Sequence, residues 1–233
     1  MSQDFTVLFA LYPRVTQLDF TGPYEVFTRL PGARMVLAST AGGDLEFDGG
    51  MRLTQLRRLA DVEQCGLLCV PGGYGTVEAL EDQAYLAELR RLAPGARFLT
   101  SVCTGSLLLA AAGLLQGRRA ACHWAWRELL PLLGAVPDGA RVVRDGNVIT
   151  GGGVTAGIDL ALSVVAQIAG RDFAETVQLA LEYAPAPPFD SGRPERARPE
   201  ILAAARRRLD ATQDARRAAV RRAAQRIGLP AAT

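Results

Sequence analysis

The segment from Phe98 to Gly113 constrains the fold and chemistry of this chain more than any other. It reads as a short run of β-branched and aromatic residues, then Cys103, then small residues, and then a long apolar run that favours a helix. This order predicts a strand, a tight turn and a helix, with the cysteine on the turn, which is the geometry of a nucleophile elbow. Ser101 and Gly105 flank Cys103 at minus two and plus two, where a sharp turn needs small side chains.

A cysteine in this position is a candidate nucleophile. The first free N–H groups of the following helix point at the sulfur, and the positive end of the helix dipole favours the thiolate. We therefore expect the pKa of Cys103 to lie below the ordinary thiol value of about 8.5. The alternative is that Cys103 is a small buried hydrophobic residue, the usual role of a free cysteine.

Length and composition bound the rest of the interpretation. The 233 residues, 49% apolar and 21% charged, suffice for one α/β domain with a proper core or for two small domains. No apolar run reaches the length of a membrane span, and the first residues lack the pattern of a secretory signal. We therefore expect a cytoplasmic protein that does not bind membranes.

The cysteines and the lone histidine argue against disulfides and metals. Cys65, Cys69, Cys103 and Cys122 do not have the spacing of a disulfide framework, which belongs to shorter secreted chains. His123 is the one histidine, and no Cys-x-x-Cys pair is present. We expect neither a metal nor another cofactor.

Strand-like and helix-like segments alternate along the chain. Nearly all-apolar strands in such an alternation predict a mainly parallel sheet with helices on both faces, a flavodoxin-like α/β class. The expected strands are Phe5–Leu11, Arg34–Ser39, Leu67–Val70, Arg97–Val102, Arg141–Val143 and Val148–Thr150. The expected helices are Pro23–Leu30, Val77–Leu92, Gly105–Leu115, Trp124–Leu133 and Thr155–Ala169. Turn residues at 144–147 and within 46–52 predict two antiparallel hairpins.

In such sheets the site lies at the carboxyl ends of the strands. Cys103 ends one strand, and the Pro71–Gly75 loop follows another, so the two loops share a rim. One interpretation of the glycine loop is an oxyanion hole in which the N–H of Gly72 or Gly73 faces the same point as the N–H of Thr104. The other is a simple turn before a helix.

Asp19 leaves the first strand at the same rim and opens a helix. Asp19 and Thr21 are both plausible helix N-caps, and on the residues alone capping is the favoured role of Asp19. A carboxyl group beside a thiolate would instead have a raised pKa and could donate a proton.

Two further segments approach this rim. The glycine run that includes Gly152 ends a strand, and with Val154 it opens a helix. One interpretation is that these glycines allow the helix to pack closely on the sheet, and the other is that they form a wall of the Cys103 pocket. His123 follows the cysteine by twenty residues at the start of an expected helix, and we expect it to pack or to support the site.

The C-terminal tail differs in composition from the rest of the chain. We expect an α/β domain over residues 1–184, followed over 185–233 by a Pro-rich linker and a basic helix packed on the domain or on a dimer partner. All 26 basic residues of the chain are arginines, and 11 of them lie between Arg193 and Arg226. Because about 35 residues cannot hold a DNA-binding domain with its own core, we do not expect nucleic-acid binding.

Several motifs resemble one family. They are QLDFTGP at 17–23, CVPGGYG at 69–75, TSVCTGSLLLAAAGLLQGRRA at 100–120, HWAW at 123–126, RVVRDGNVITGGGVTAGIDLAL at 141–162 and QLALEYAPAPPF at 178–189. The chain resembles the ThiJ/PfpI superfamily, whose fold is similar to that of class I glutamine amidotransferases, and within it the isocyanide hydratases. Peptidase-like members carry a histidine directly after the cysteine, and Thr104 departs from that pattern.

The resemblance implies a nucleophilic Cys103 with Asp19 beside it, and Thr104, Gly72 and the loop from Gly152 to Val154 around them. It implies a lyase that adds water to an isocyanide through a cysteine thioimidate and releases an N-substituted formamide, and it implies a homodimer. Two alternatives remain open: a glyoxalase or stress-protective enzyme of the same superfamily, and a non-enzymatic sensor or regulator whose cysteine is oxidised.

Overall fold

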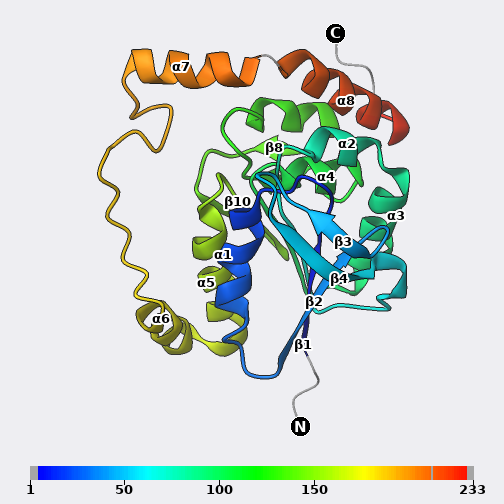
Figure 1. Ribbon diagram of the computed structural model, residues 1–233, viewed down its shortest axis with the longest axis vertical. Helices are drawn as coiled ribbons and strands as arrows, with labels where there is room; N and C mark the ends of the chain where they lie inside the picture. Colours follow the sequence, from blue (N-terminus) through cyan, green and yellow to red (C-terminus); the bar gives the residue numbers. More distant parts are fainter. Residues whose placement is uncertain (1–4, 211, 230–233) are drawn as a thin grey trace.

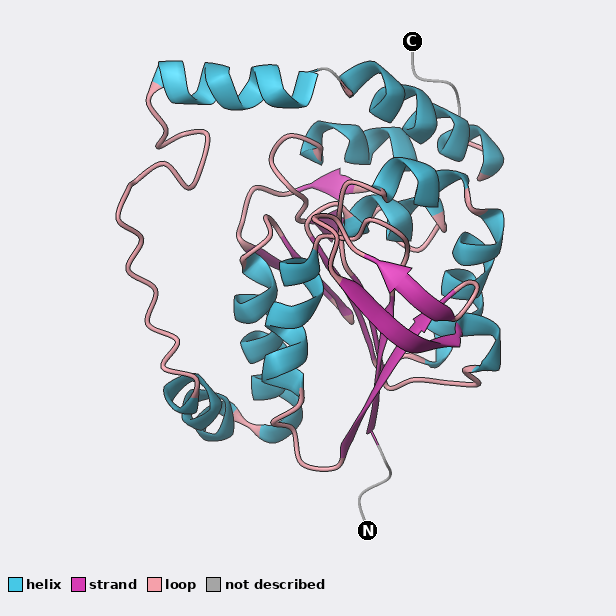
Figure 2. Cartoon of the chain, viewed as in Figure 1, coloured by secondary structure: helices cyan, strands magenta, loops and turns pink. Residues whose placement is uncertain are grey.

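One eight-stranded sheet forms the centre of the molecule (Figures 1 and 2). The structure is a computed structural model that describes residues 5–210 and 212–229. In their order across the sheet, the strands are β3 (Gly43–Glu46), β4 (Arg52–Arg58), β2 (Ala33–Ser39), β1 (Phe5–Ala10), β5 (Leu67–Val70), β6 (Phe98–Val102), β10 (Val148–Gly151) and β9 (Val142–Asp145). A two-stranded sheet pairs β7 (Arg119–Ala120) with β8 (Val136–Pro137).

The central strands β2, β1, β5, β6 and β10 are all parallel. Their order across the sheet is the 2-1-3-4-5 order of a flavodoxin-like fold, with the switch point between β1 and β5. Residues 7–10 of β1 and all of β5 are fully buried, because helices cover both faces of the sheet. The predicted fold class is confirmed.

Both predicted hairpins are present at the edges of the sheet. Asp145 pairs with Val148 in the antiparallel β9–β10 hairpin, and Glu46 pairs with Arg52 in the β3–β4 hairpin. The β3–β4 hairpin extends the sheet beyond β2, and its two strands run beyond the 46–52 segment in which the hairpin was predicted.

Two groups of helices enclose the sheet (Figure 1). One face carries α1 (Gln17–Phe27), α5 (Ala156–Ala169) and α6 (Arg171–Ala180). The other carries α2 (Thr76–Glu81), α3 (Gln83–Leu92), α4 (Gly105–Ala111), the 3-10 helix η3 (Arg127–Leu133) and α8 (Gln213–Arg226). Two short 3-10 turns, η1 (Leu59–Asp61) and η2 (Ala93–Gly95), complete the connections. No helix among the described residues is long and apolar enough to cross a membrane.

Several helix boundaries differ from those expected. Helix α1 begins at Gln17 rather than at Pro23, and its N-cap is Thr16, whose side chain makes no capping bond. Asp19 therefore lies inside the first turn, and the N-cap interpretation of Asp19 is wrong. The helix expected over 77–92 is divided at Asp82, whose carboxylate accepts the Tyr85 N–H and caps α3. Helix α6 was not expected.

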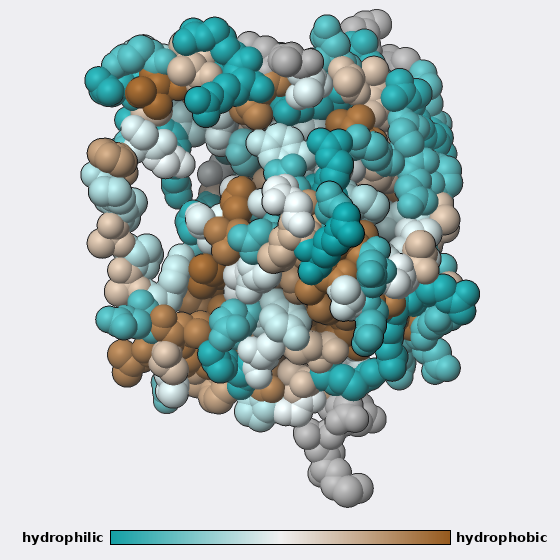
Figure 3. Space-filling view, in the orientation of Figure 1, coloured by the Kyte–Doolittle hydropathy of each residue, from teal (hydrophilic) through white to brown (hydrophobic). Residues whose placement is uncertain are grey.

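The C-terminal segment contains two helices where one was expected. A largely exposed linker runs from residue 183 to 198 along the outside of the molecule, and an opening separates it from the body in Figure 3. It leads to α7 (Pro199–Asp210) and then to α8. Helix α8 packs on α2 and η3 and buries Ala219, Val220, Ala223 and Ala224 in the same core as the sheet.

Candidate active site

The start of one helix and two loops meet at the carboxyl ends of neighbouring parallel strands. Asp19 follows β1, Gly72 follows β5, and Cys103 follows β6. Since β1 and β5 flank the switch point of the sheet, this rim is where α/β folds of this kind bind their ligands. The structure thus brings together the two residues that the sequence analysis singled out as a pair.

Cys103 lies on a strained turn between β6 and α4. Its φ angle is 59°, in the left-handed region that few non-glycine residues occupy, and its N–H donates to the Gly151 carbonyl at 3.0 Å. The turn is also tight. A Cβ atom on Gly105 would lie 2.0 Å from the carbonyl oxygen of Val70, so only glycine lets α4 begin against β5. The strand, turn and helix of the predicted elbow are all observed.

Asp19 is fully buried beneath this turn. Its Oδ2 accepts the Gly72 N–H at 2.9 Å, and its buried Oδ1 has no conventional hydrogen-bond partner among the described residues. Burial raises the pKa of Asp19 to about 7, while the Cys103 thiol and the Gly72 N–H act in the opposite direction. A carboxyl group with this pKa can exchange a proton near neutral pH.

The pKa of Cys103 is opposite to the one expected. Burial raises it well above the ordinary thiol value, and the charge of Asp19 and the neighbouring Cys122 raise it further. The Thr104 N–H at the helix start lowers it, but this effect is smaller than the loss of water. Cys103 is therefore held as a thiol beside a carboxyl group, and the expectation of a stabilised thiolate is wrong.

A chain of buried hydroxyl groups fixes the glycine loop. Thr104 Oγ1 accepts the Gly73 N–H at 3.0 Å and lies 2.7 Å from Thr76 Oγ1, which donates to the Gly73 carbonyl. The Tyr12 hydroxyl lies 3.1 Å from Thr76 Oγ1 and donates to the Pro71 carbonyl at 3.1 Å. These hydroxyl groups therefore hold the loop through the Gly73 N–H and through the carbonyl groups of Pro71 and Gly73.

These contacts leave neither glycine N–H of the expected oxyanion hole free in this structure. The Gly72 N–H donates to Asp19 Oδ2, and the Gly73 N–H donates to Thr104 Oγ1. The Thr104 N–H lowers the pKa of Cys103, as described above. A Cβ atom on Gly72 would lie 2.4 Å from the Thr104 nitrogen and 2.8 Å from Asp19 Oδ2. Gly72 is thus required for the close approach of its loop to Thr104 and Asp19.

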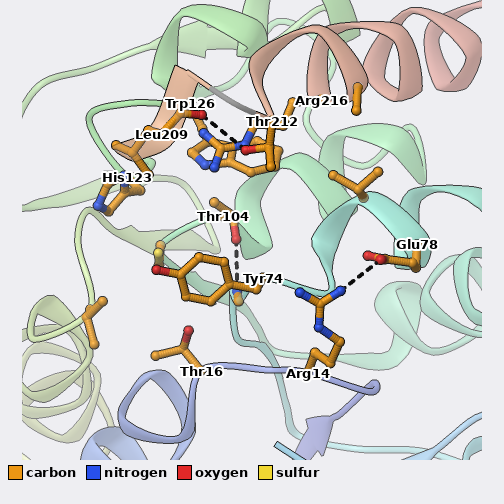
Figure 4. Close-up of a pocket in the computed structure, with 15 residues that line it drawn as sticks. Arg14, Thr16, Tyr74, Glu78, Thr104, His123, Trp126, Leu209, Thr212 and Arg216 are labelled. Atoms are coloured by element: carbon orange, nitrogen blue, oxygen red, sulfur yellow. Dashed lines mark hydrogen bonds and ion pairs between the residues drawn. The ribbon is translucent and has the colours of Figure 1, made fainter. Parts of the chain in front are cut away.

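A cavity of about 260 Å³, shown in Figure 4, has Cys103 in its lining. Its walls are mainly apolar. The lining residues are Arg14, Thr16, Gly73, Tyr74, Val77, Glu78, Cys103, Thr104, His123, Trp126, Val154, Leu209, Thr212, Ala215 and Arg216. Gly73, Thr104 and Val154 thus line the pocket as expected, whereas Asp19 and Gly72 lie below it. Gly152 lines a neighbouring cavity of about 240 Å³, which His123 and Val154 also border.

His123 lines the pocket instead of only packing behind it. Its Nδ1 accepts the Ala125 N–H at 3.3 Å, so the neutral ring carries its proton on Nε2. Burial, followed by the charge of Arg216, lowers the pKa of His123 to about 4. The imidazole is therefore neutral at physiological pH and offers one fixed N–H donor. The Arg216 guanidinium in turn lies 4.3 Å from the centre of the Trp126 ring.

The sequence analysis missed the C-terminal part of the pocket. Leu209, Thr212, Ala215 and Arg216 line it from α7, α8 and their junction. The apolar spacing in the tail predicted a docked helix, but no local signal says which surface it covers.

Among the described residues, no cluster of three or more His, Cys, Asp or Glu side chains has the arrangement of a metal site.

Comparisons with known proteins show what the chain is similar to. The chain is 48% identical to an isonitrile hydratase from Pseudomonas putida over 95% of this chain and 97% of that protein. It is 34% identical to the transcriptional regulator CdhR from Pseudomonas aeruginosa, but it spans only 54% of that protein.

Solved structures give the same grouping. A ThiJ/PfpI family protein from Pseudomonas syringae superposes with a TM-score of 0.90 at 36% identity, covering 94% of this chain and 91% of that one. Drosophila melanogaster DJ-1beta shares the fold, with a TM-score of 0.70 at 22% identity, covering 78% of this chain and all of that one. The profile of the DJ-1/PfpI family matches residues 5–167, which include the cysteine elbow and Asp19. The chain belongs to the DJ-1/PfpI family.

Proposed function

We propose that this protein is an isocyanide hydratase, which adds water to R–N≡C and releases an N-substituted formamide. The observation that carries the proposal is the buried contact between Asp19 and Cys103, whose side chain lines a mainly apolar pocket. The near full-length similarity to an isonitrile hydratase supports the same reaction. An isocyanide has an electrophilic terminal carbon and a hydrocarbon substituent, and both suit this pocket.

The first half of the reaction joins the substrate to the sulfur. Cys103 begins as a thiol and Asp19 as a carboxylate, since the pKa of the acid is about 7 and that of the thiol lies well above it. As the sulfur attacks the terminal carbon, the thiol proton passes to Asp19 and from there to the same carbon. The product is a thioimidate, R–N=CH–S–Cys103. Because no free thiolate is formed in the buried site, its desolvation cost is avoided.

The second half consumes one water molecule. The Asp19 carboxylate takes a proton from water as the hydroxyl adds to the thioimidate carbon, and it passes this proton to the nitrogen. The C–S bond then breaks as the hydroxyl group becomes the formamide carbonyl, the hydroxyl proton passes by way of Asp19 to the sulfur, and R–NH–CHO leaves. These steps balance without an oxidant or reductant, and each proton transfer is made by a carboxyl group whose pKa is near the working pH.

The function is tested by incubating the purified protein with an alkyl isocyanide, an aryl isocyanide and methylglyoxal. We expect formamide from both isocyanides and no lactate from methylglyoxal. Cys103→Ala should lose at least about a thousandfold in kcat/KM because it removes the nucleophile. Cys65→Ala, at a buried cysteine outside the site, is the matched control and should retain activity.

Other outcomes would assign the protein elsewhere. Turnover of methylglyoxal alone would favour the glyoxalase alternative. No turnover of either substrate by a folded protein would favour a sensor or regulator. Full isocyanide turnover by Cys103→Ala would exclude the covalent mechanism.

Activity and stability should change in opposite directions with pH. Turnover needs the Asp19 carboxylate, so kcat/KM should rise with pH through about 7 and then level off. The folded-state pKa lies above the value of about 3.9 for a free Asp, so the folded protein binds the extra proton between these values. The contribution of Asp19 to the free energy of unfolding therefore falls as pH rises from about 4 to about 7. A pH–rate profile and thermal melts measure both.

Asp19→Asn is the matched variant for this prediction. The amide oxygen can keep the Gly72 hydrogen bond, but the side chain can no longer exchange a proton. We expect a loss of at least about a hundredfold in kcat/KM, no titration near pH 7, and a melting temperature at pH 8 equal to or above that of the wild type. Near-normal turnover with an unchanged pH profile would exclude Asp19 as the acid and base.

We also propose that the protein is a cytoplasmic homodimer. Support comes from two large apolar side chains on the side of the molecule that carries the linker, Leu179 of α6 and Phe189, which are 81% and 79% exposed. Exposed apolar groups of this size are typical of interaction surfaces. Light scattering of the purified protein should give twice the mass of the chain, and a monomer mass at micromolar concentration would contradict the proposal.

A further inference from the structure

Part of the wall of the pocket that Cys103 lines is built by residues outside the family match. The match ends at residue 167, whereas Leu209, Thr212, Ala215 and Arg216 all follow it. These residues come from the end of α7, the start of α8 and the junction between the two helices (Figure 4). The tail thus adds a roof to the cleft that holds the cysteine.

Helix α8 is the fixed half of this roof. Its apolar face is buried in the core, with Val220 and Ala219 fully enclosed. Arg222 and Arg226 both pair with Glu81 of α2, and Arg217 pairs with Glu128 of η3 at 3.0 Å. The buried Arg216 lies over Trp126, which itself lines the pocket. The position of this part of the roof is therefore set by packing on two elements of the domain.

Leu209 is held at the junction. The Thr212 hydroxyl donates to the Leu209 carbonyl at 3.1 Å, and the Thr212 N–H donates to it at 3.2 Å. None of the side chains described for α7 is fully buried, so the body of α7 adds little to hold this end in place. The junction hydrogen bonds tie Leu209 to the start of α8 instead.

Leu209 also forms a boundary between two hollows. Together with Arg216 it lines both the Cys103 pocket and a neighbouring, more polar hollow of about 370 Å³. The second hollow is bordered by Glu128, Arg206 and Gln213, which are exposed. The apolar Leu209 side chain thus lies between the Cys103 pocket and the more polar hollow.

We propose that Leu209 is a specificity-determining residue that limits the size of the substituent R on the isocyanide. This inference rests on the proposed function and deepens it. The Cys103 pocket takes compact, uncharged hydrocarbon substituents. Its walls are mainly apolar, and the Leu209 side chain closes it on the side of the more polar hollow. A smaller residue at this position joins the two hollows and admits bulkier substituents.

The test compares Leu209→Ala and Leu209→Trp with the wild type on a compact and a bulky isocyanide. Leu209→Ala should raise the ratio of kcat/KM for the bulky over the compact substrate by at least about tenfold, and Leu209→Trp should lower it. Leu202→Ala is the matched control, since Leu202 lies on the same helix, is also half-buried and lines neither hollow. The two Leu209 variants change the volume in opposite directions, so a general loss of stability cannot imitate the result.

A second readout does not depend on turnover. Cys103 is alkylated with iodoacetamide or with a pyrenyl maleimide, and the labelled peptide is identified by mass spectrometry. Leu209→Ala should speed up labelling by the bulky reagent while leaving the small one nearly unchanged. If the wild type hydrates isocyanides but neither ratio responds to Leu209, the inference is wrong. If the labelling ratio responds but no isocyanide is hydrated, Leu209 does limit the access of bulky groups to Cys103, and the proposed function is wrong.

Discussion

The structure of the site depends on burying a thiol and a carboxyl group in contact. Burial raises the pKa of each group and so favours its neutral form. Together they form a pair in which one proton can move between sulfur and oxygen with little change in net charge. This explains how a cysteine without a stabilised thiolate can serve as a nucleophile: its base is already in place, and the reaction does not need a free anion.

Close backbone packing holds the pair in place. Gly105 lets the cysteine helix start against β5, and Gly72 lets the β5 loop lie between Asp19 and Thr104, at distances that any side chain would prevent. The hydroxyl groups of Tyr12, Thr76 and Thr104 then satisfy most of the polar groups of that loop internally. Among the residues that the structure describes, the buried Asp19 Oδ1 is left without a conventional hydrogen-bond partner, and in the proposed mechanism this carboxyl group exchanges the proton.

The parts predicted from the sequence are those set by local pattern. The apolar strands, the two hairpins and the elbow around Cys103 follow from periodicity and turn residues over a few positions. The position of Asp19 was predicted less well, because the helix starts before its sequence signals and the residue's partner, Gly72, is far away in the chain. The pKa of Cys103 was predicted with the wrong sign, since the helix start is visible in sequence and the depth of burial is not. The roof residues Leu209 and Arg216 depend on where a tail docks, which only the tertiary packing decides.

The central claim is that hydration proceeds through a covalent bond to Cys103. It is tested most directly by acid-quenching the protein during its first turnover of an isocyanide and measuring the mass of the Cys103 peptide. The account predicts an adduct equal to the whole mass of the isocyanide, which forms and decays at rates that match the appearance of the formamide. Formamide released in the first turnover with no adduct on Cys103, or with an adduct that decays more slowly than the product appears, would contradict it.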